Sequence, residues 1–335
     1  MKILTYLLGL GLMADAVFGE GQSAPQVPAI HASEQIQKPD FAITNASAAA
    51  AGIIAYNPTG RYLAVAGDRT IQIYDTNARD GLTPNQTRTL TDHTAQILGL
   101  AFSGTNTLVS VSADQTAKIW DVETGKLLHT AQIQLAKQLC FAIAPGRLLA
   151  ADTSFGRVRL WNFETGEILK SFEPGDSWAS VLAFTPDEKS LVIGTEKGVL
   201  RVMDVATWAV TRTIDLDSPI RSLAVSAEHI VVGYSDGTVA MLNFGDQPSV
   251  PEVKKQSGAI NALAFIPKSD FFASASADHT IKIFETSSLK LLSSLQSQGA
   301  PLLALSLSLN GKTIVSLNSS GVLEFWTLPK EHDLK

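Results

Sequence analysis

The residues best suited to chemistry in this sequence are a serine, a histidine and an aspartate that lie near one another. Ser112 and Asp114 belong to the stretch "VSVSADQTAKIWD", and His93 lies a short way before it. In a serine hydrolase these residue types supply the nucleophile, the general base and the carboxylate that orients the base. The stretch has no Gly-x-Ser-x-Gly turn to expose the serine, and no oxyanion donors can be identified around it.

A fourth residue of this segment, Trp120, favours a structural role. The N–H group of a buried indole needs a hydrogen-bond acceptor. A chain from this N–H to the Ser112 hydroxyl, then to His93 and Asp114, would satisfy every donor. We therefore predict that the four residues brace the structure, and that the protein has no catalytic residues.

Other catalytic or cofactor chemistry has no support in the sequence. The six histidines, at 31, 93, 129, 229, 279 and 332, form no pair with metal-ligand spacing. No glycine-rich phosphate loop is present, and no pair of acidic residues can be singled out as an acid and base couple. We expect no cofactor and no metal.

The elements that must position these residues repeat along the chain. Segments resembling "KIWD" recur about every 42 residues, and they end at Asp75, Asp121, Asn162, Asp204, Asn243, Glu285 and Thr327. Each unit also has two earlier apolar runs, such as "ILGLAF" and "LVSVS", and a later, more polar one. Short apolar runs separated by turn residues are typical of strands. The sequence predicts an all-β, seven-bladed propeller of four-stranded antiparallel blades.

These units resemble the WD-repeat (WD40-type) family of β-propellers. The second unit, "HTAQILGLAFSGTNTLVSVSADQTAKIWDVETGKLL", matches the family pattern almost throughout, and the resemblance covers residues 50–335. Units four, five and seven depart from it, with Met203, Leu242 and Thr327 where Trp or Asp is usual. The resemblance implies that His93, Ser112, Asp114 and Trp120 are the structural tetrad of the family.

The resemblance also implies how the ring closes. Few residues follow Thr327, so the outer strand of the last blade is expected from the N-terminal segment "SEQIQKPDFAI", Ser33–Ile43. Pro39 suits an edge strand, where a missing donor is tolerated. We therefore assign residues 33–335 to the propeller and residues 20–32, rich in Gly, Pro, Ser and Gln, to a flexible lead.

The first residues are typical of an export signal. Lys2 precedes the apolar run Ile3–Ala14, and small residues allow cleavage after Ala16 or Gly19, so residues 1–19 are predicted to be a signal peptide. The run is shorter than the roughly 20 apolar residues of a membrane-spanning helix, so no membrane insertion is expected. We expect a periplasmic protein, with secretion as the alternative.

Composition narrows the partners. The chain of 335 residues is 45% hydrophobic, has a net charge of -6 and contains one cysteine, which excludes an internal disulfide. A mildly acidic chain without a basic run is a poor ligand for nucleic acid. We expect a globular protein, monomeric by itself, whose partner is another exported protein.

Partners of the resembling family commonly dock around the central channel, on the rim formed by the loops before the first strands and the turns after the second. The rim residues predicted by aligning the units are Trp178, Phe155, Lys197, Lys137, Gln96, Arg69 and His279. A large aromatic in a polar loop, such as Trp178, is typical of an interface anchor. We predict a non-enzymatic scaffold.

The identity of the exported partner stays open at this stage. Some periplasmic members that the chain resembles accompany respiratory enzymes such as nitrate reductases, which implies an accessory or assembly role. The alternatives are a propeller hydrolase or lyase with its site at the channel mouth, and a small-molecule or glycan binder that uses Trp178 for stacking.

Overall fold

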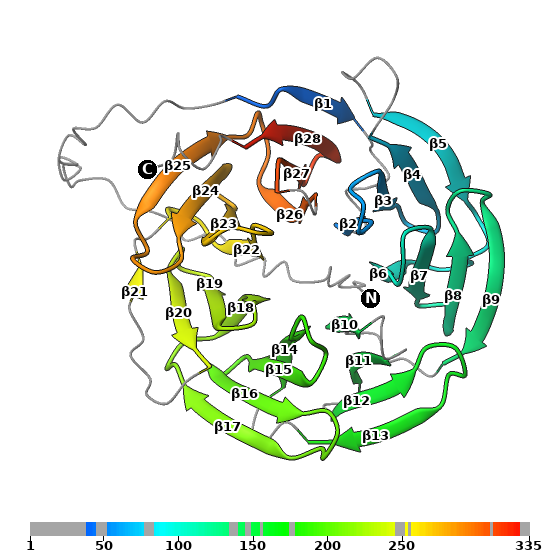
Figure 1. Ribbon diagram of the computed structural model, residues 1–335, viewed down its shortest axis with the longest axis horizontal. Helices are drawn as coiled ribbons and strands as arrows, with labels where there is room; N and C mark the ends of the chain where they lie inside the picture. Colours follow the sequence, from blue (N-terminus) through cyan, green and yellow to red (C-terminus); the bar gives the residue numbers. More distant parts are fainter. Residues whose placement is uncertain are drawn as a thin grey trace, which may run out of the picture.

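The computed structural model describes residues 38–44, 52–76, 84–133, 140–144, 149–154, 157–173, 178–244, 252–253, 256–308 and 311–328. Every regular element in these ranges is a strand, and the strands form four-stranded antiparallel sheets arranged around a common axis (Figure 1). The predicted signal peptide (1–19) and flexible lead (20–32), together with Lys137 and Phe155, lie outside the described residues.

We number the sheets one to seven in chain order. Sheet one contains β2 (Ile54–Tyr56), β3 (Tyr62–Ala66), β4 (Ile71–Asp75) and β5 (Asn85–Leu90). Sheet two contains β6 (Ile97–Phe102), β7 (Thr107–Ser112), β8 (Thr116–Asp121) and β9 (Lys126–Gln132). Sheet three contains β10 (Phe141–Ala144), β11 (Leu149–Ser154), β12 (Arg157–Asn162) and β13 (Ile168–Phe172). Sheet four contains β14 (Ala179–Phe184), β15 (Ser190–Thr195), β16 (Val199–Asp204) and β17 (Val210–Asp215).

The remaining sheets follow the same order. Sheet five contains β18 (Ile220–Val225), β19 (His229–Tyr234), β20 (Val239–Asn243) and β21 (Glu252–Val253). Sheet six contains β22 (Ile260–Phe265), β23 (Phe271–Ser276), β24 (Thr280–Glu285) and β25 (Leu291–Gln296). Sheet seven contains β26 (Leu302–Leu307), β27 (Thr313–Asn318), β28 (Val322–Thr327) and β1 (Phe41–Thr44). All seven third-strand ends predicted from the sequence coincide with the ends of strands, from Asp75 in β4 to Thr327 in β28.

Sheet seven takes its outer strand from the beginning of the chain. β1 pairs antiparallel with β28, with Phe41 opposite Phe325 and Thr44 opposite Val322. The amide of Asp40 extends this pairing by donating to the carbonyl of Phe325 at 2.9 Å. The segment predicted for this place was Ser33–Ile43. The strand lies at its C-terminal end, and residues 33–37 are outside the described ranges.

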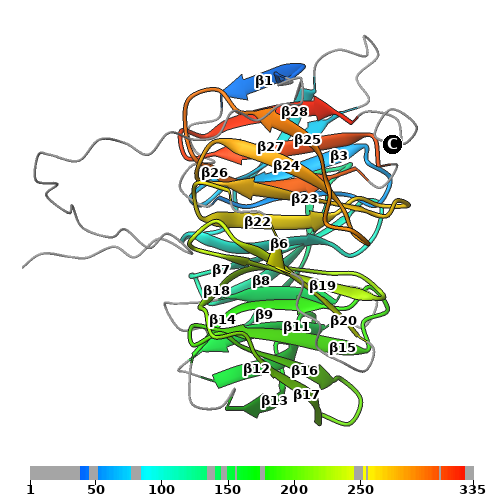
Figure 2. The same ribbon diagram turned by 90° about the vertical axis from the view of Figure 1, so that its left-hand side faces the viewer.

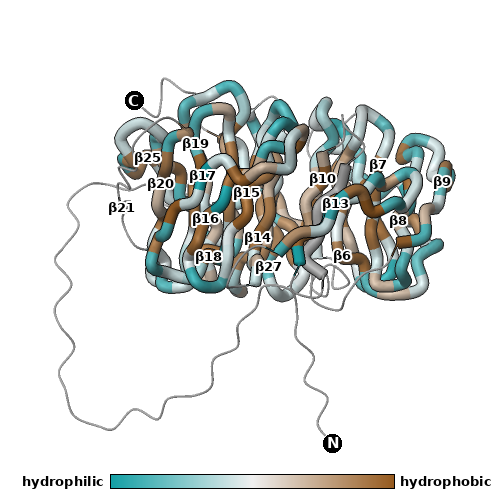
Figure 3. The backbone as a smooth tube through the Cα atoms, turned by 90° about the horizontal axis from the view of Figure 1, so that it is seen from below, coloured by the Kyte–Doolittle hydropathy of each residue, from teal (hydrophilic) through white to brown (hydrophobic). Residues whose placement is uncertain are grey.

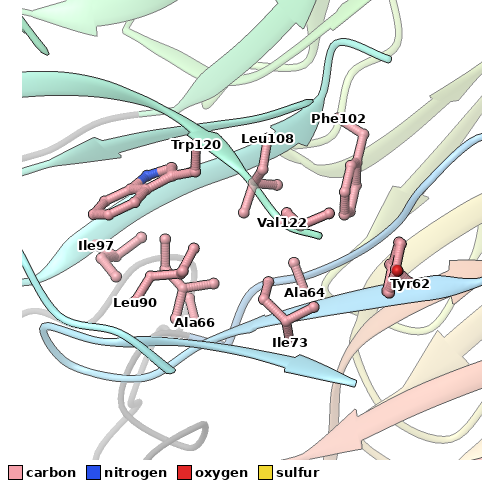
Figure 4. Packing of buried hydrophobic residues seen from close by; sticks show 11 residues of the cluster. Tyr62, Ala64, Ala66, Ile73, Leu90, Ile97, Phe102, Leu108, Trp120 and Val122 are labelled. Carbon is pink, nitrogen blue, oxygen red and sulfur yellow. The ribbon is translucent and has the colours of Figure 1, made fainter. Parts of the chain in front are cut away.

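The hydrophobic core lies between neighbouring sheets. Each of the clusters of buried side chains in the described residues joins two consecutive sheets, and one of them joins sheet seven to sheet one. Figure 4 illustrates the cluster between sheets one and two, where Trp120 and Leu108 face Ile73 and Ala64. Opposite faces of a single strand serve two clusters, since Leu108 contacts the first and Val109 the second.

This double burial explains the sequence pattern. The second and third strands of a sheet are covered on both faces, so a strand such as β3 is a continuous apolar run, while β8 is almost fully buried although it contains Thr116 and Lys118. The outer strands β9, β13 and β17 lie at the perimeter in Figure 1 and are mostly exposed. Figure 2 shows the strands from the side, joined by turns at both ends. Hydrophilic residues gather at these turns (Figure 3).

Candidate functional site

The chemistry-bearing residues of sheet two form a buried chain of hydrogen bonds. The indole Nε1 of Trp120 donates to Ser110 Oγ at 2.8 Å. Ser110 Oγ lies 2.7 Å from Nε2 of His93, whose Nδ1 lies 2.7 Å from Asp114 Oδ2. The chain thus links β8, β7, the loop before β6 and the turn between β7 and β8.

The prediction that Ser112 belongs to this chain is wrong, because Ser110 occupies that place. Both serines are on β7. Ser112 pairs with Thr116 of β8, which is four residues from Trp120, whereas Ser110 pairs with Lys118, which is two residues from Trp120. With a rise of about 3.3 Å per residue, Ser112 lies beyond the reach of the indole. Its hydroxyl instead donates to the carbonyl of Ala95 at 2.9 Å.

A neutral His93 satisfies every donor of this chain of hydrogen bonds. Ser110 accepts from the indole and donates to Nε2, while the Nδ1–H donates to Asp114, so each donor meets one acceptor. Burial lowers the pKa of His93 and outweighs the opposing effect of Asp114. Burial on its own would raise the pKa of Asp114, but hydrogen bonds from the Thr116 hydroxyl and the Thr94 amide, with that of His93, lower it.

Acid should therefore weaken the fold through His93. The folded state holds this histidine neutral with a lowered pKa, so the unfolded chain binds the proton more readily, and stability is lost as pH falls below the ordinary value near 6.5. We expect the free energy of unfolding of His93→Gln to fall less than that of the wild type between pH 7.5 and 5. Urea unfolding at each pH measures this, with His129→Gln on the exposed face of β9 as control. Equal pH dependence of the wild type and His93→Gln would contradict it.

The burial of these four hydrogen-bonded residues fits a structural brace and not a catalytic site. Ser110 is fully buried and His93 is 5% exposed, so a substrate has no access to the hydroxyl. The prediction is confirmed for the histidine, the aspartate and the tryptophan, and it is wrong for the serine, which lies two residues earlier than predicted. A usable signal exists in the spacing, because Ser110 and Trp120 are ten residues apart and so are Ser316 and Trp326.

Sheet six contains a related brace, with a glutamine in place of the histidine and Phe284 in place of the tryptophan. Gln256 is buried, accepts from the hydroxyl of Ser274, and donates from Nε2 to Thr280 Oγ1 at 2.8 Å. Thr280 donates in turn to Asp278 Oδ1 at 2.6 Å, just as Thr116 does to Asp114 in sheet two. This brace was not predicted, because a glutamine before the first strand is not part of a recognisable sequence motif.

Sheet seven has a third variant. The indole of Trp326 donates to Ser316 Oγ at 3.0 Å, and this hydroxyl donates to Glu324 Oε2 at 3.3 Å. The other carboxylate oxygen accepts from the amide of Gln298 at 2.9 Å. Here a buried glutamate of β28 itself takes the place of the imidazole. The braces share one pattern. A serine of the second strand hydrogen-bonds to an acceptor side chain, and that side chain holds the loop before the first strand of the same sheet.

Five of the seven rim residues predicted from the sequence lie in the described part of the chain, namely Gln96, Trp178, Lys197, Arg69 and His279. In several sheets the residue after the second strand donates its amide to the loop before the first strand, as Ala113 does to Gln96 and Glu196 to Trp178. Gln96 is half-buried, and Lys197 is exposed in the turn after β15. The other two lie on sheets farther apart along the chain: Arg69 is exposed beside Asp68 in sheet one, and His279 is half-buried in sheet six with φ 71°.

Trp178 is the most exposed large hydrophobic side chain of the described residues, at 59%. It precedes β14, and the amide of Glu196, next to Lys197, donates to its carbonyl at 3.0 Å. The backbone is therefore fixed while the indole faces solvent. Trp208, by contrast, packs against the core cluster between sheets three and four.

A second exposed apolar feature was not foreseen from the sequence. Among the described residues, the exposed large hydrophobic side chains other than Trp178 all lie near the beginning of the outer strands of three consecutive sheets: Leu127, Leu128, Ile168, Leu169 and Val210. We call these five residues the outer band. In the sequence they look like ordinary strand residues, and only the fold places them on an uncovered perimeter.

The described residues contain no group of three or more His, Cys, Asp and Glu side chains that could hold a metal ion. Nor do they contain a helix with the length and hydropathy needed to cross a membrane.

Antiparallel four-stranded sheets around an axis, with a Trp, Ser, His and Asp brace in sheet two, are consistent with a WD40 β-propeller. Comparison with known families supports this class, because residues 51–75, 84–121 and 250–285 match the family described as "WD domain, G-beta repeat". These matches cover parts of sheets one, two and six, and β21 of sheet five.

Individual relatives are WD-repeat proteins of diverse roles. The chain is 22% identical to "THO complex subunit 3" of Arabidopsis thaliana over 67% of its own length and 74% of that protein. It is 27% identical to "Eukaryotic translation initiation factor 3 subunit I" of Aspergillus terreus over 55% of its length and 60% of that protein. It is 23% identical to "Autophagy-related protein 16" of Arabidopsis thaliana over 71% of its length and 40% of that protein. The chain thus spans less than two thirds of the last two.

Proposed function

We propose that this protein is a seven-bladed WD40 propeller, closed by β1, that acts as a non-enzymatic scaffold. The closure is supported by the pairing of β1 with β28 and by the cluster that joins sheet seven to sheet one. The role is supported by the names of two relatives, which are subunits of larger assemblies. On this proposal the partner is another exported protein, and the export signal at residues 1–19 delivers the scaffold to the periplasm.

The outer band is the observation that carries the interaction. Exposed large apolar side chains are normally scattered singly on a monomer, and a contiguous set marks an interaction surface. The five residues of the outer band occupy equivalent strand positions on sheets two, three and four, and neighbouring sheets touch there. The ring of His129 on β9, for example, hydrogen-bonds to the carbonyl of Glu164 in the turn before β13. Trp178 also belongs to sheet four, but it lies at the other end of the strands: it precedes Ala179, which pairs with Thr195, whereas Val210 pairs with Met203.

The experiment is capture of partners from the periplasm by the full chain. We expect one stoichiometric partner for the wild type, and a loss of affinity of at least about tenfold for the double variant Leu128→Glu, Leu169→Glu, because two charges would be buried in an apolar contact. The matched control, Gln86→Glu with Thr87→Glu, adds the same charges to the exposed face of β5 and should retain the partner.

A further arm tests the rim. If the partner also contacts the rim of sheet four, the double variant Trp178→Ala, Lys197→Glu should weaken capture. Full retention of the partner by the outer-band variant, or the absence of any partner from the wild type, would contradict the proposal. Turnover of a substrate by the wild type without a partner would favour a propeller enzyme instead.

A further inference from the structure

The innermost strands of the sheets carry one charged side chain among them. These strands are β2, β6, β10, β14, β18, β22 and β26, and their residues are apolar, small or uncharged except for Arg221 on β18. The neighbours of β18, which are β14 and β22, contain no acidic or basic residue. Arg221 therefore places a single cation among the strands that surround the axis.

A β-bulge sets the position of this arginine. The pairing of β18 with β19 passes from Ile220 opposite Tyr234 to Ser222 opposite Gly233, which leaves Arg221 outside the ladder. The same irregularity occurs at the second residue of four other innermost strands, namely Leu98, Ser180, Asn261 and Leu303. A bulge redirects a side chain and is common beside binding sites. Arg221 is the second residue of β18, close to the loop that precedes this strand.

Hydrogen bonds to the next two sheets hold the guanidinium in place. Nε of Arg221 donates to Asn261 Oδ1 at 2.8 Å, and Nδ2 of Asn261 donates to the carbonyl of Leu302 at 2.6 Å. Within the described residues, Nη1 and Nη2 make no hydrogen bond and Arg221 joins no ion pair. The end of the guanidinium is thus oriented by a second residue while its four terminal hydrogens stay available.

The electrostatic environment of Arg221 is unfavourable for the free protein. Burial lowers the pKa of this half-buried guanidinium, and no carboxylate of the described residues offsets the effect. A partly desolvated charge without a counterion costs free energy, and proteins usually pair such groups. An arginine kept in this state and held by an asparagine is organised to receive an anion from outside.

We propose that Arg221 binds a carboxylate group near the beginning of β18, where this strand faces the central axis, through paired hydrogen bonds from Nη1 and Nη2. A planar guanidinium end matches the two oxygens of a carboxylate. The single cation balances the single charge of a carboxylate, whereas a phosphate group near neutral pH carries closer to two charges. This site lies on a different sheet from the outer band and does not depend on the proposed function.

The test is an NMR titration of the full chain with sodium acetate, following the ¹⁵Nε resonance of Arg221 at constant ionic strength set with sodium chloride. We expect a saturable shift of this resonance in acetate and none in chloride. Arg221→Gln should weaken acetate binding, monitored at the Asn261 side-chain amide, at least about tenfold. Arg212→Gln removes an equal charge from β17 and should leave the response unchanged, as should the outer-band double variant.

Two further arms complete the experiment. A hexaglutamate peptide that binds more than tenfold tighter than acetate would assign the carboxylate to a protein partner, and equal affinities would assign it to a small molecule. Arg221→Met, which removes the uncompensated charge and keeps the side-chain length, should fold with a melting temperature equal to or above that of the wild type. No response to acetate, an equal response in Arg221→Gln, or binding of sodium phosphate alone would overturn the proposal.

Discussion

His93→Ala is expected to destabilise the fold by about 3 kcal/mol, which corresponds to a fall in melting temperature of about 5–10 °C. The substitution removes the acceptor of the Ser110 hydroxyl and the donor to Asp114, and it leaves a void beside Trp120 in the core between sheets one and two. Stranding a buried polar group costs about 1–3 kcal/mol, and the loop before β6 loses its tether as well. Thermal unfolding followed by circular dichroism measures the change.

His93→Gln and His129→Ala separate the brace from a general effect of losing a histidine. Gln256 fills the equivalent place in sheet six, so glutamine at position 93 should restore most of the stability. His129 is exposed on β9, and its replacement should cost less than about 1 kcal/mol. An unchanged melting temperature for His93→Ala would refute the brace. Ser112→Ala should leave the indole bond intact, whereas Ser110→Ala should remove it.

Gly237→Ala is expected to cost at least about 3 kcal/mol, the second large effect. Gly237 has φ +85° in the turn between β19 and β20, a region that costs an L-residue about 1–2 kcal/mol. A Cβ at this position would lie 1.9 Å from the carbonyl oxygen of Gln256, whose amide bonds to the carbonyl of Gly237 at 2.7 Å. The loop must move, and with it the glutamine that braces sheet six; overpacking adds about 1–3 kcal/mol.

Gly125→Ala is the matched control for this substitution. Gly125 has φ +78°, close to that of Gly237, but a Cβ there would first meet the flexible side chain of Arg88 at 3.0 Å. The backbone strain is therefore shared and the clash with backbone is absent. We expect the control to lose about 1 kcal/mol in urea unfolding, and equal losses in the two variants would show that the contact with Gln256 does not matter.

The strands were predictable because their signal is local. Apolar runs and turn residues recur with a regular period, so the end of each third strand could be read from the chain, including Asn243 and Thr327 in units that lack the usual dipeptide. Burial on both faces keeps apolar residues in these strands in every unit, although charged residues such as Arg159 and Lys282 also occur there. His93, Asp114 and Trp120 were likewise identified as one set from residue type and order.

The serine of the brace depended on the register between two strands. Ser110 and Ser112 are on the same face of β7, and composition does not distinguish them. Only the pairing of Leu108 with Trp120 places one of them beside the indole. The same limit hid Gln256 and Glu324, since neither residue type suggests a brace until the fold brings it to a serine.

The sequence by itself determined the repeating strands, the residue types of the brace in sheet two and the candidate rim loops, because these follow from local pattern and spacing. The tertiary structure decided which side chains meet and which stay uncovered. Leu128 and Leu169 are exposed because their strands lie at the outer edges of their sheets, and Arg221 has no ion pair among the described residues because the neighbouring innermost strands carry no acid. Both properties arise from residues far apart in the chain, so no local pattern encodes them.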